Sequence, residues 1–326
     1  MHKPKNLQKC INCSACTKKC DFLTKYDLNL VDFYNRPDLA YSCFLCDICT
    51  QICPVNIDGV EISLYLRKQK PKKFNYLNFS KQSPFKSPYI YANNSNLKSS
   101  ELMFFGCNFP GYFPKTTEYL IELLGKQGID FSIDCCGKPL YEANLEFGKT
   151  KNHLEELLHN KGVKKIITAC PNCYYFFKNH YKFNGIEISS IYLKLEELGL
   201  MKNIEEKMNL FFPCPDKFQK EIFENFKNYI KFDNTFKKVN CCGMGGLAKK
   251  DEPEVYQNNI NIIKEKNAEN VYTYCATCAG NFQKNGIKNV KHLTSEFVGI
   301  HETPNTNYLK NLLKFKFYKR RANESR

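Results

Sequence analysis

Long apolar runs are missing from this sequence of 326 residues. No run approaches the roughly eighteen apolar residues that a transmembrane helix needs. The opening segment MHKPKNLQKC also lacks the hydrophobic core of a secretory signal. We therefore expect neither a membrane span nor export. The expected location is the cytoplasm, with the cytoplasmic face of a membrane as the alternative.

A G-x-G-x-x-G fingerprint is absent too, so we expect no flavin or nicotinamide bound by that route. Histidine is scarce, and all six histidines stand away from the cysteine motifs; they are His2, His153, His159, His180, His292 and His301. A surface or packing role is expected for each, and His180 and His292 are the two to test. The sequence offers no persuasive protein nucleophile, and its catalytic residues stay unknown.

Cysteine is what the chain has in excess, with 18 residues. A disulfide framework belongs to small secreted proteins, so without an export signal metal binding is the better interpretation. The formal net charge of +15 overstates the basic character, because thiolates would add negative charge and the lysines are spread along the chain. We expect no nucleic-acid partner. An acidic redox partner or an anionic membrane surface fits better.

Two segments share the spacing C-x2-C-x2-C-x3-C, namely CINCSACTKKC at 10–20 and CFLCDICTQIC at 43–53. This is the bacterial ferredoxin spacing for [4Fe–4S] clusters, in which the fourth cysteine of a run ligates the other cluster. We expect two cubane clusters, one on Cys10, Cys13, Cys16 and Cys53, the other on Cys43, Cys46, Cys49 and Cys20. Zinc is the alternative, but zinc takes four ligands, usually as two separated pairs. Asp21 replaces the usual proline after Cys20.

The segments around these runs favour helices. Residues 21–42 have helix-compatible apolar spacing, and Asp58 is placed to cap a helix within 54–70. Residues 1–70 thus resemble the helical two-cluster ferredoxins of respiratory iron–sulfur subunits. Residues 71–100, rich in Lys, Asn, Ser and Pro, are expected to form a linker.

The remaining ten cysteines form two matching sets of five. The sets are Cys107, Cys135, Cys136, Cys170 and Cys173, and Cys214, Cys241, Cys242, Cys275 and Cys278. Each later cysteine follows its counterpart by 105 to 107 positions. A nearly constant offset indicates an internal duplication.

The sequence around the two sets alternates between strands and helices. Strands are expected at 101–106, 164–169, 208–213 and 269–274, and helices at 115–128, 152–162, 217–232 and 254–270. The alternation predicts a small parallel α/β sheet in each copy, with the cysteines at the carboxyl ends of the strands. We expect two such domains, at 101–205 and 206–305, and a basic tail at 306–326. The fold class is therefore multidomain α+β.

The repeated pattern, C…CCG…CPNC and then C…CCG…CATC, resembles the cysteine-rich CCG domain of heterodisulfide reductases. The chain also resembles the iron–sulfur subunits of anaerobic glycerol-3-phosphate dehydrogenase and glycolate oxidase. The resemblance implies a noncubane [4Fe–4S] cluster on each set of five cysteines. Gly137 and Gly243 would let the backbone pass close to these clusters. Gly245 and Gly246 would leave room for a substrate in the second copy, whereas GKPLYE at 137–142 predicts a more closed first copy.

By this resemblance, electrons pass from two cubane clusters to two noncubane clusters that reduce a disulfide. The alternative is an electron-transfer subunit of a flavin-dependent hydroxy-acid or glycerol-3-phosphate dehydrogenase that delivers electrons to quinone. A flavoprotein or other redox partner is expected in both cases. The tail interleaves Leu and Phe with Lys and Arg, which would suit docking on a membrane or membrane subunit, though a frayed, solvated end fits equally.

Overall fold

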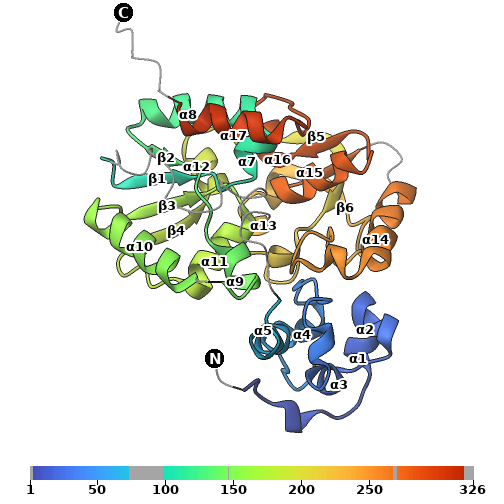
Figure 1. Ribbon diagram of the computed structural model, residues 1–326. Coiled ribbons are helices and arrows are strands. Elements are labelled where there is room, and N and C mark those ends of the chain that lie inside the picture. Colours follow the sequence, from blue (N-terminus) through green and yellow to red (C-terminus); the bar gives the residue numbers. More distant parts are fainter. Residues whose placement is uncertain (1–2, 73–97, 146, 267–269, 319–326) are drawn as a thin grey trace, which may run out of the picture.

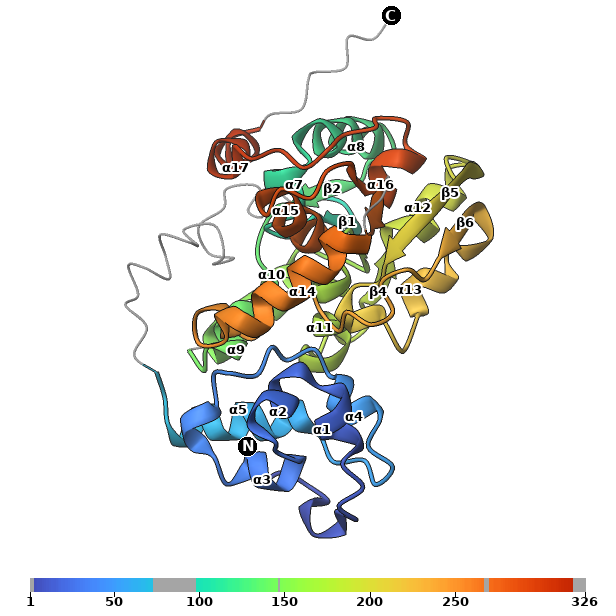
Figure 2. The ribbon, with the colours of Figure 1, turned by 90° about the vertical axis from the view of Figure 1, so that its right-hand side faces the viewer.

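The computed structural model describes residues 3–72, 98–145, 147–266 and 270–318. Figure 1 shows a small helical N-terminal domain below two α/β domains that lie side by side. Figure 2 gives the same arrangement from a second direction, with the N-terminal domain against the lower end of both. Most of the expected linker, at 73–97, lies outside the described residues.

The N-terminal domain, residues 3–72, contains only short helices. They are η1 (Leu7–Lys9), α1 (Ala15–Lys19), α2 (Asp21–Tyr26), α3 (Leu30–Tyr34), η2 (Pro37–Leu39), α4 (Ile48–Gln51) and α5 (Gly59–Gln69). Asp58 caps α5 as expected, because its carboxylate accepts a hydrogen bond of 2.8 Å from the Glu61 amide. The core of this domain is built from apolar residues of these helices together with buried cysteines.

The first α/β domain has a four-stranded parallel sheet in the order β2-β1-β3-β4. Its strands are β1 (Glu101–Phe104), β2 (Asp130–Ser132), β3 (Lys165–Thr168) and β4 (Glu187–Ser190). Its helices are α7 (Phe109–Tyr112), α8 (Pro114–Lys126), α9 (Lys138–Glu142), α10 (Phe147–Asn160), α11 (Pro171–His180) and α12 (Ile191–Glu197). The expected strands and helices of this copy are confirmed.

The second α/β domain repeats the topology in the order β6-β5-β7-β8, again all parallel. Its strands are β5 (Ile204–Phe211), β6 (Ile230–Asp233), β7 (Val271–Thr273) and β8 (Val290–His292). Its helical segments are η4 (Cys214–Asp216), α13 (Glu221–Glu224), η5 (Lys227–Tyr229), η6 (Ala248–Lys250), α14 (Pro253–Lys266), α15 (Ala276–Lys284) and α16 (Leu293–Phe297). Identical strand order confirms the duplication.

The long helix expected over 217–232 is wrong. The segment forms only the single turn α13 and η5, and then enters strand β6. Lys220 takes a left-handed conformation with φ of 57°, which stops a helix from running through it. The Asp216 carboxylate accepts from the amides of Ile222 and Phe223 at 3.1 and 3.0 Å and fixes the short turn. Pairing of β6 with β5 then overrides the local helical pattern.

The C-terminal segment is an ordered helix as far as the structure describes it. Helix α17 (Tyr308–Lys316) packs on α7 of the first α/β domain, where Leu312 and Phe315 are buried. The Tyr308 hydroxyl donates to the Cys107 carbonyl at 3.0 Å, and the Asn311 side chain donates to the Gly111 carbonyl at 2.8 Å. Residues 306–318 are therefore not a frayed end. In the described part of the chain, no helix combines the length and apolarity needed to cross a bilayer.

Candidate metal centres

The two N-terminal cysteine runs fold into the same unusual turn. In each run, both residues beside the middle cysteine have left-handed backbone angles: Asn12 and Ser14 around Cys13, and Leu45 and Asp47 around Cys46. Their φ values lie between 51° and 68°. Non-glycine residues with positive φ are uncommon, and they concentrate at functional sites. Because both runs have the same strained turn, we expect them to bind the same kind of group.

Two small cavities divide these eight cysteines into two groups of four. Cys10, Cys13, Cys16 and Cys53 line the first cavity. Cys20, Cys43, Cys46 and Cys49 line the second, together with Cys241 of the second α/β domain. Each group of N-terminal cysteines draws three from one run and one from the other, the exchange that the ferredoxin spacing requires. Four thiols of the N-terminal domain around one space form a donor set that is chemically suited to an iron–sulfur cluster.

A single bound metal ion suits the geometry less well. Within the residues that the structure describes, no three Cys, His, Asp or Glu side chains converge as ligands of one ion. A zinc site needs four ligands within about 2–2.3 Å of one centre. A cluster spreads its ligands over several irons, so its cysteines stand further apart.

The ten remaining cysteines lie beyond the carboxyl ends of the strands. Cys107 follows β1, Cys135 and Cys136 follow β2, and Cys170 and Cys173 open helix α11. The second copy repeats this placement, with Cys214 after β5, Cys241 and Cys242 after β6, and Cys275 and Cys278 opening α15. All ten are buried except Cys214, which is partly exposed.

Thiol contacts show which of these sulfurs lie together. Hydrogen bonds from Cys135 and Cys173 lower the pKa of Cys136 to about 6, which joins the first set. Hydrogen bonds from Cys170 and Cys278 lower the pKa of Cys275. Cys170 belongs to the first copy and Cys275 to the second, so the two sets meet. Thiolate is the form of cysteine that binds metal. The contacts favour thiolate at Cys136 and Cys275, and the same hydrogen bonds raise the pKa of their partners Cys173, Cys170 and Cys278.

Polar side chains of the two CxxC motifs cross between the copies. Asn172 of CPNC donates to the Cys275 sulfur at 3.9 Å. Thr277, at the matching position of CATC, accepts at 2.7 Å from Asn108, which follows Cys107. Each copy therefore places a side chain beside the cysteines of the other. The sequence pattern alone did not indicate these two residues, because they are the variable positions of the motif.

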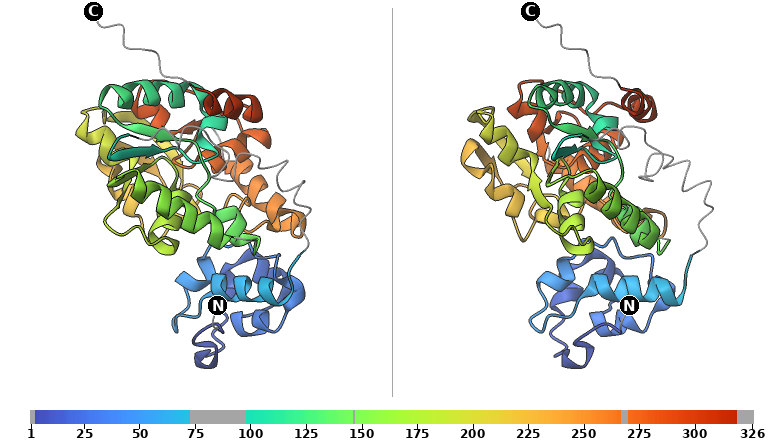
Figure 3. Two further views of the ribbon diagram at one scale, coloured as in Figure 1. Left: turned by 60° about the vertical axis from the view of Figure 1, so that its left-hand side comes forward. Right: turned by 90° about the vertical axis from the view of Figure 1, so that its left-hand side faces the viewer.

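The second N-terminal run reaches the second five-cysteine set. A hydrogen bond from Cys241 lowers the pKa of Cys46, so the two sulfurs are neighbours. Phe44, in the same turn, is buried in the core that the two α/β domains share. Figure 3 shows how the N-terminal domain, in blue, abuts both α/β domains at this end. The run at 43–53 is thus inserted where the two copies meet.

Gly245 and Gly246 make room for the 43–46 turn of the N-terminal domain. The expectation that they leave room for a substrate is therefore wrong. A side chain on Gly246 would overlap the carbonyl oxygen of Cys43, and one on Gly245 would overlap that of Phe44. Gly246 also has a φ of 64°. The two glycines let the backbone of the second copy lie directly against the 43–46 turn. Gly243 has a different neighbour, the ring of Tyr256, which a side chain at 243 would strike.

Arg67 fastens the same turn from the other side and was not expected from the sequence. Its guanidinium is fully buried and donates to the carbonyls of Ala40, Cys43 and Glu142 at 2.9, 3.0 and 2.8 Å. It also stacks over the ring of Tyr41, 4.7 Å from its centre. One side chain thus ties α5 and the cysteine turn to the first α/β domain. The sequence did contain one indication of this role, because Arg67 falls on the apolar face of the helix expected within 54–70.

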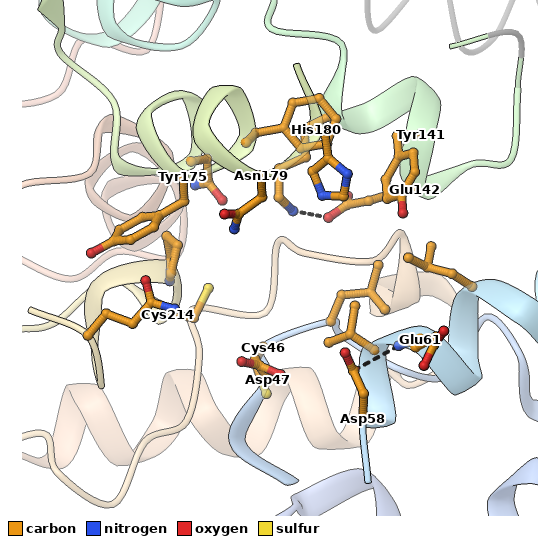
Figure 4. Close-up of a pocket in the computed structure, with 18 of the residues that line it drawn as sticks. Cys46, Asp47, Asp58, Glu61, Tyr141, Glu142, Tyr175, Asn179, His180 and Cys214 are labelled. Atoms are coloured by element: carbon orange, nitrogen blue, oxygen red, sulfur yellow. Dashed lines mark hydrogen bonds and ion pairs between the residues drawn. The ribbon is translucent and has the colours of Figure 1, made fainter. Parts of the chain in front are cut away.

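An open pocket lies between the N-terminal domain and the two α/β domains. Its volume is about 550 Å³, and both Cys46 and Cys214 lie in its wall. Helix α9 of the first copy borders it, so the expected closed GKPLYE segment in fact faces the open space. Figure 4 shows His180 pointing into this pocket from α11. His180 therefore lies nearer to the cysteines than its sequence position suggested.

The two histidines singled out in the sequence are both neutral packing residues. Burial lowers the pKa of His180 to about 4, and its ring packs on Tyr141 and Phe176 with centroids 4.5 and 4.6 Å away. Burial lowers the pKa of His292 to about 4 as well. His292 accepts a hydrogen bond of 3.2 Å from the Thr294 amide and caps α16.

Comparison with known proteins agrees with this geometry. Residues 102–178 and 208–283 both match the profile of the cysteine-rich domain family CCG. An iron–sulfur protein of Methanocaldococcus jannaschii, itself uncharacterised, is 24% identical over 329 residues, which cover 84% of this chain and 67% of that protein. One subunit of the fumarate reductase (CoM/CoB) of Methanothermobacter marburgensis is 22% identical, covering 88% of this chain and 70% of the relative.

A third relative is one subunit of the dihydromethanophenazine:CoB–CoM heterodisulfide reductase of Methanosarcina barkeri. It is 23% identical over 297 residues, which cover 75% of this chain and 72% of the relative. The fold and these matches define a protein with two CCG cysteine-rich domains. Over most of its length the chain is thus similar to iron–sulfur proteins and to subunits of oxidoreductases, one of them a heterodisulfide reductase.

Proposed function

We propose that the chain conducts electrons along its cysteine sets and delivers them to a disulfide. The observation that carries this proposal is a series of thiol contacts that links three cysteine sets. Cys170 contacts Cys275 between the two copies, and Cys46 contacts Cys241 between the N-terminal domain and the second copy. Electron transfer needs redox groups that are close together, and disulfide cleavage needs two electrons at one site. The second five-cysteine set takes part in both contacts, so it links the N-terminal domain to the first copy.

Each cysteine set has a proposed cluster. Two cubane [4Fe–4S] clusters would be held by Cys10, Cys13, Cys16 and Cys53 and by Cys20, Cys43, Cys46 and Cys49, in support of which the two cavities group these residues. Two noncubane [4Fe–4S] clusters would be held by the two sets of five. When bound, such clusters supply one-electron transfer at potentials set by charge, hydrogen bonding and exposure.

The protein's own residues would hold and tune these sites. Asn172 directs an amide proton at the Cys275 sulfur, and such hydrogen bonds set the potential of a cluster. Arg67 holds the Cys43 carbonyl and with it the turn that carries Cys46. Phe44 seals the junction from water. The partly exposed Cys214 leaves the second five-cysteine set open to the pocket.

A redox partner with an acidic face would dock on a basic hollow beside the second cavity. Lys19, Lys217, Lys220 and Lys237 line this hollow. None of the four pairs with a carboxylate among the described residues, and Lys217 donates only to the Val239 carbonyl, at 2.6 Å. Lys19 precedes Cys20 directly, so a partner bound here would stand next to a cysteine set. Complementary charge of this kind speeds the encounter of redox proteins.

Docking at a membrane face or on a membrane subunit is proposed for α17. Leu309, Leu313 and Phe317 are exposed at 49%, 47% and 70%, and their spacing places them on one side of the helix. Lys310, Lys314 and Lys316 flank this stripe. An apolar stripe with flanking lysines suits an anionic interface. Sedimentation with anionic vesicles tests the proposal, and the double variant Leu309→Ser/Leu313→Ser should lose the binding.

The disulfide function is tested with the full chain purified without oxygen. Reduced viologen serves as the electron donor and 2-hydroxyethyl disulfide as the acceptor. We expect viologen oxidation that depends on the disulfide and yields two thiols per two electrons. Cys241→Ser should abolish it, while exposed Glu156→Gln should not. Viologen oxidation by a quinone analogue but by no disulfide would instead favour the electron-transfer alternative.

A further inference from the structure

The pocket between the N-terminal domain and the two α/β domains has an uneven distribution of charge. Figure 4 shows Asp47, Asp58 and Glu61 along the wall formed by the N-terminal domain, opposite Tyr141, Asn179 and His180. The volume of about 550 Å³ is that of a small-molecule site. Because Cys46 and Cys214 also face it, a bound molecule would touch two cysteine sets.

The three carboxylates of the first wall have no cationic partner among the residues that the structure describes. The Asp47 carboxylate accepts from the Gln51 amide at 2.6 Å, Asp58 accepts from the backbone of α5, and Glu61 accepts from a backbone amide at 3.4 Å. A partly buried carboxylate normally has a cation beside it. Here the position that a cation would occupy beside these carboxylates faces the pocket.

The opposite wall does not supply the missing positive charge. Its lysine, Lys138, already pairs with Glu142 in the same helix turn. His180 is uncharged at neutral pH because burial lowers its pKa to about 4. Asn172 and Asn179 are neutral donors and acceptors. The pocket as a whole therefore attracts cations and repels anions.

Aromatic side chains add a second preference for a cation. Tyr141, Tyr175 and Phe218 line the pocket, and Phe218 is 37% exposed at its rim. An ammonium group over such rings gains from the negative charge of the ring face. An anion gains nothing there. Charge and aromatic lining thus point to the same class of ligand.

We infer that this pocket binds a small organic cation, an amine-bearing disulfide or the aminothiol formed from it. The inference rests on the proposed disulfide function and specifies its substrate class. In the reaction, R–S–S–R takes up two electrons and two protons, the S–S bond breaks, and two R–SH molecules form. A low-potential one-electron donor, such as reduced viologen, supplies the electrons. The ammonium groups contact Asp47 and Glu61, and the sulfurs lie toward Cys46 and Cys214.

The test compares three disulfides of similar size and different charge on the full chain purified without oxygen. They are cystamine with two amines, neutral 2-hydroxyethyl disulfide and anionic dithiodiglycolate. We expect kcat/KM with reduced viologen to be highest for cystamine and lowest for dithiodiglycolate. Calorimetric titration with oxidised protein should show the same order in Kd. Removing one carboxylate should cost about fivefold in preference for cystamine over the neutral disulfide.

Two pocket variants and one control make the test independent of a single substitution. Glu61→Gln and Asp47→Asn should each lower the ratio of cystamine to neutral disulfide, in both kcat/KM and Kd. Glu156→Gln, on the exposed face of α10, should leave the ratio unchanged. Equal or tighter binding of dithiodiglycolate would overturn the inference while leaving disulfide reduction intact. Reduction of none of the three disulfides would instead contradict the proposed function, and the order of Kd would still decide the inference.

Discussion

Cys170 and Cys275 occupy the same place in the two repeats, and their thiols contact each other. Each of the two is the N-cap residue of its helix, α11 or α15. The contact therefore joins the two five-cysteine sets through equivalent positions of the duplicated domains.

Because the two residues are equivalent in the repeats, we expect Cys170→Ser and Cys275→Ser to have similar effects. Each substitution should remove about four irons per chain, since one [4Fe–4S] cluster is lost from the affected set. Iron and acid-labile sulfide analysis on anaerobically purified protein measures the loss. Full iron content in either variant would contradict the assignment of that cysteine as a ligand.

The contact at Gly246 predicts a strong effect of one methyl group. Gly246→Ala should destabilise the fold well beyond the roughly 1 kcal/mol expected from a positive φ alone, because the methyl overlaps the Cys43 carbonyl. Gly199→Ala is the matched control, since Gly199 has a φ of 66° and open space around it. Urea unfolding of the two variants gives the comparison. Equal losses of stability would show that the close approach has no energetic weight.

We expect the loss of the Arg67 guanidinium to weaken the packing of the N-terminal domain on the first α/β domain. Arg67→Met removes the guanidinium donor of the Cys43 and Glu142 carbonyls and leaves the Ala40 carbonyl only the Ser63 hydroxyl, which should cost about 2–4 kcal/mol of unfolding free energy. Limited proteolysis should then release the N-terminal domain faster. The control is Arg36→Met, which removes an exposed guanidinium paired with Asp38 and should change little. Wild-type stability in the Arg67 variant would contradict the role of Arg67 in holding the N-terminal domain on the first α/β domain.

His292 predicts a loss of stability in mild acid. Its pKa is about 4 in the folded protein because of burial, against about 6.5 in an unfolded chain. The unfolded state therefore binds the extra proton first, and stability falls as the pH drops from about 6.5 toward 4. Between pH 7 and pH 5 this amounts to about 2 kcal/mol.

The histidine prediction is checked by urea unfolding of the wild type and of His292→Gln at both pH values. The variant should show a shallower pH dependence, whereas exposed His153→Gln should behave as the wild type does. An unchanged pH dependence in His292→Gln would mean that other groups cause the acid sensitivity.

The sequence allowed the repeat and its parallel sheets to be predicted, because these depend on fixed cysteine spacing and on apolar strand patterns. The assignment of the cysteines to four clusters stays a prediction. The helix over 217–232 was mispredicted, since pairing of β6 with β5 is a tertiary effect that no local pattern contains. Gly245 and Gly246 were interpreted as space for a substrate. Their neighbour is the turn at 43–46, some two hundred positions away, and only the folded chain brings these segments together.

Arg67 and the pocket carboxylates could not be assigned for the same reason. Each acts on a partner from another domain: Arg67 on Glu142, and Asp47 and Glu61 across a gap from α9 and α11. For helix α17 the sequence pattern left a packed helix and a solvated end equally open. Its alternation of Leu, Phe and Lys was compatible with a solvated end, yet Leu312 and Phe315 pack into the core.

The measurement that tests the account most directly is the iron, sulfide and zinc content of protein purified without oxygen, together with its EPR spectrum. The account predicts about sixteen irons per chain, four for each of four clusters, and one signal that changes when thiol is added. About eight irons with zinc, and no signal that responds to thiol, would contradict it. The two CCG domains would then hold no cluster, and the chain could not deliver electrons through them to a disulfide.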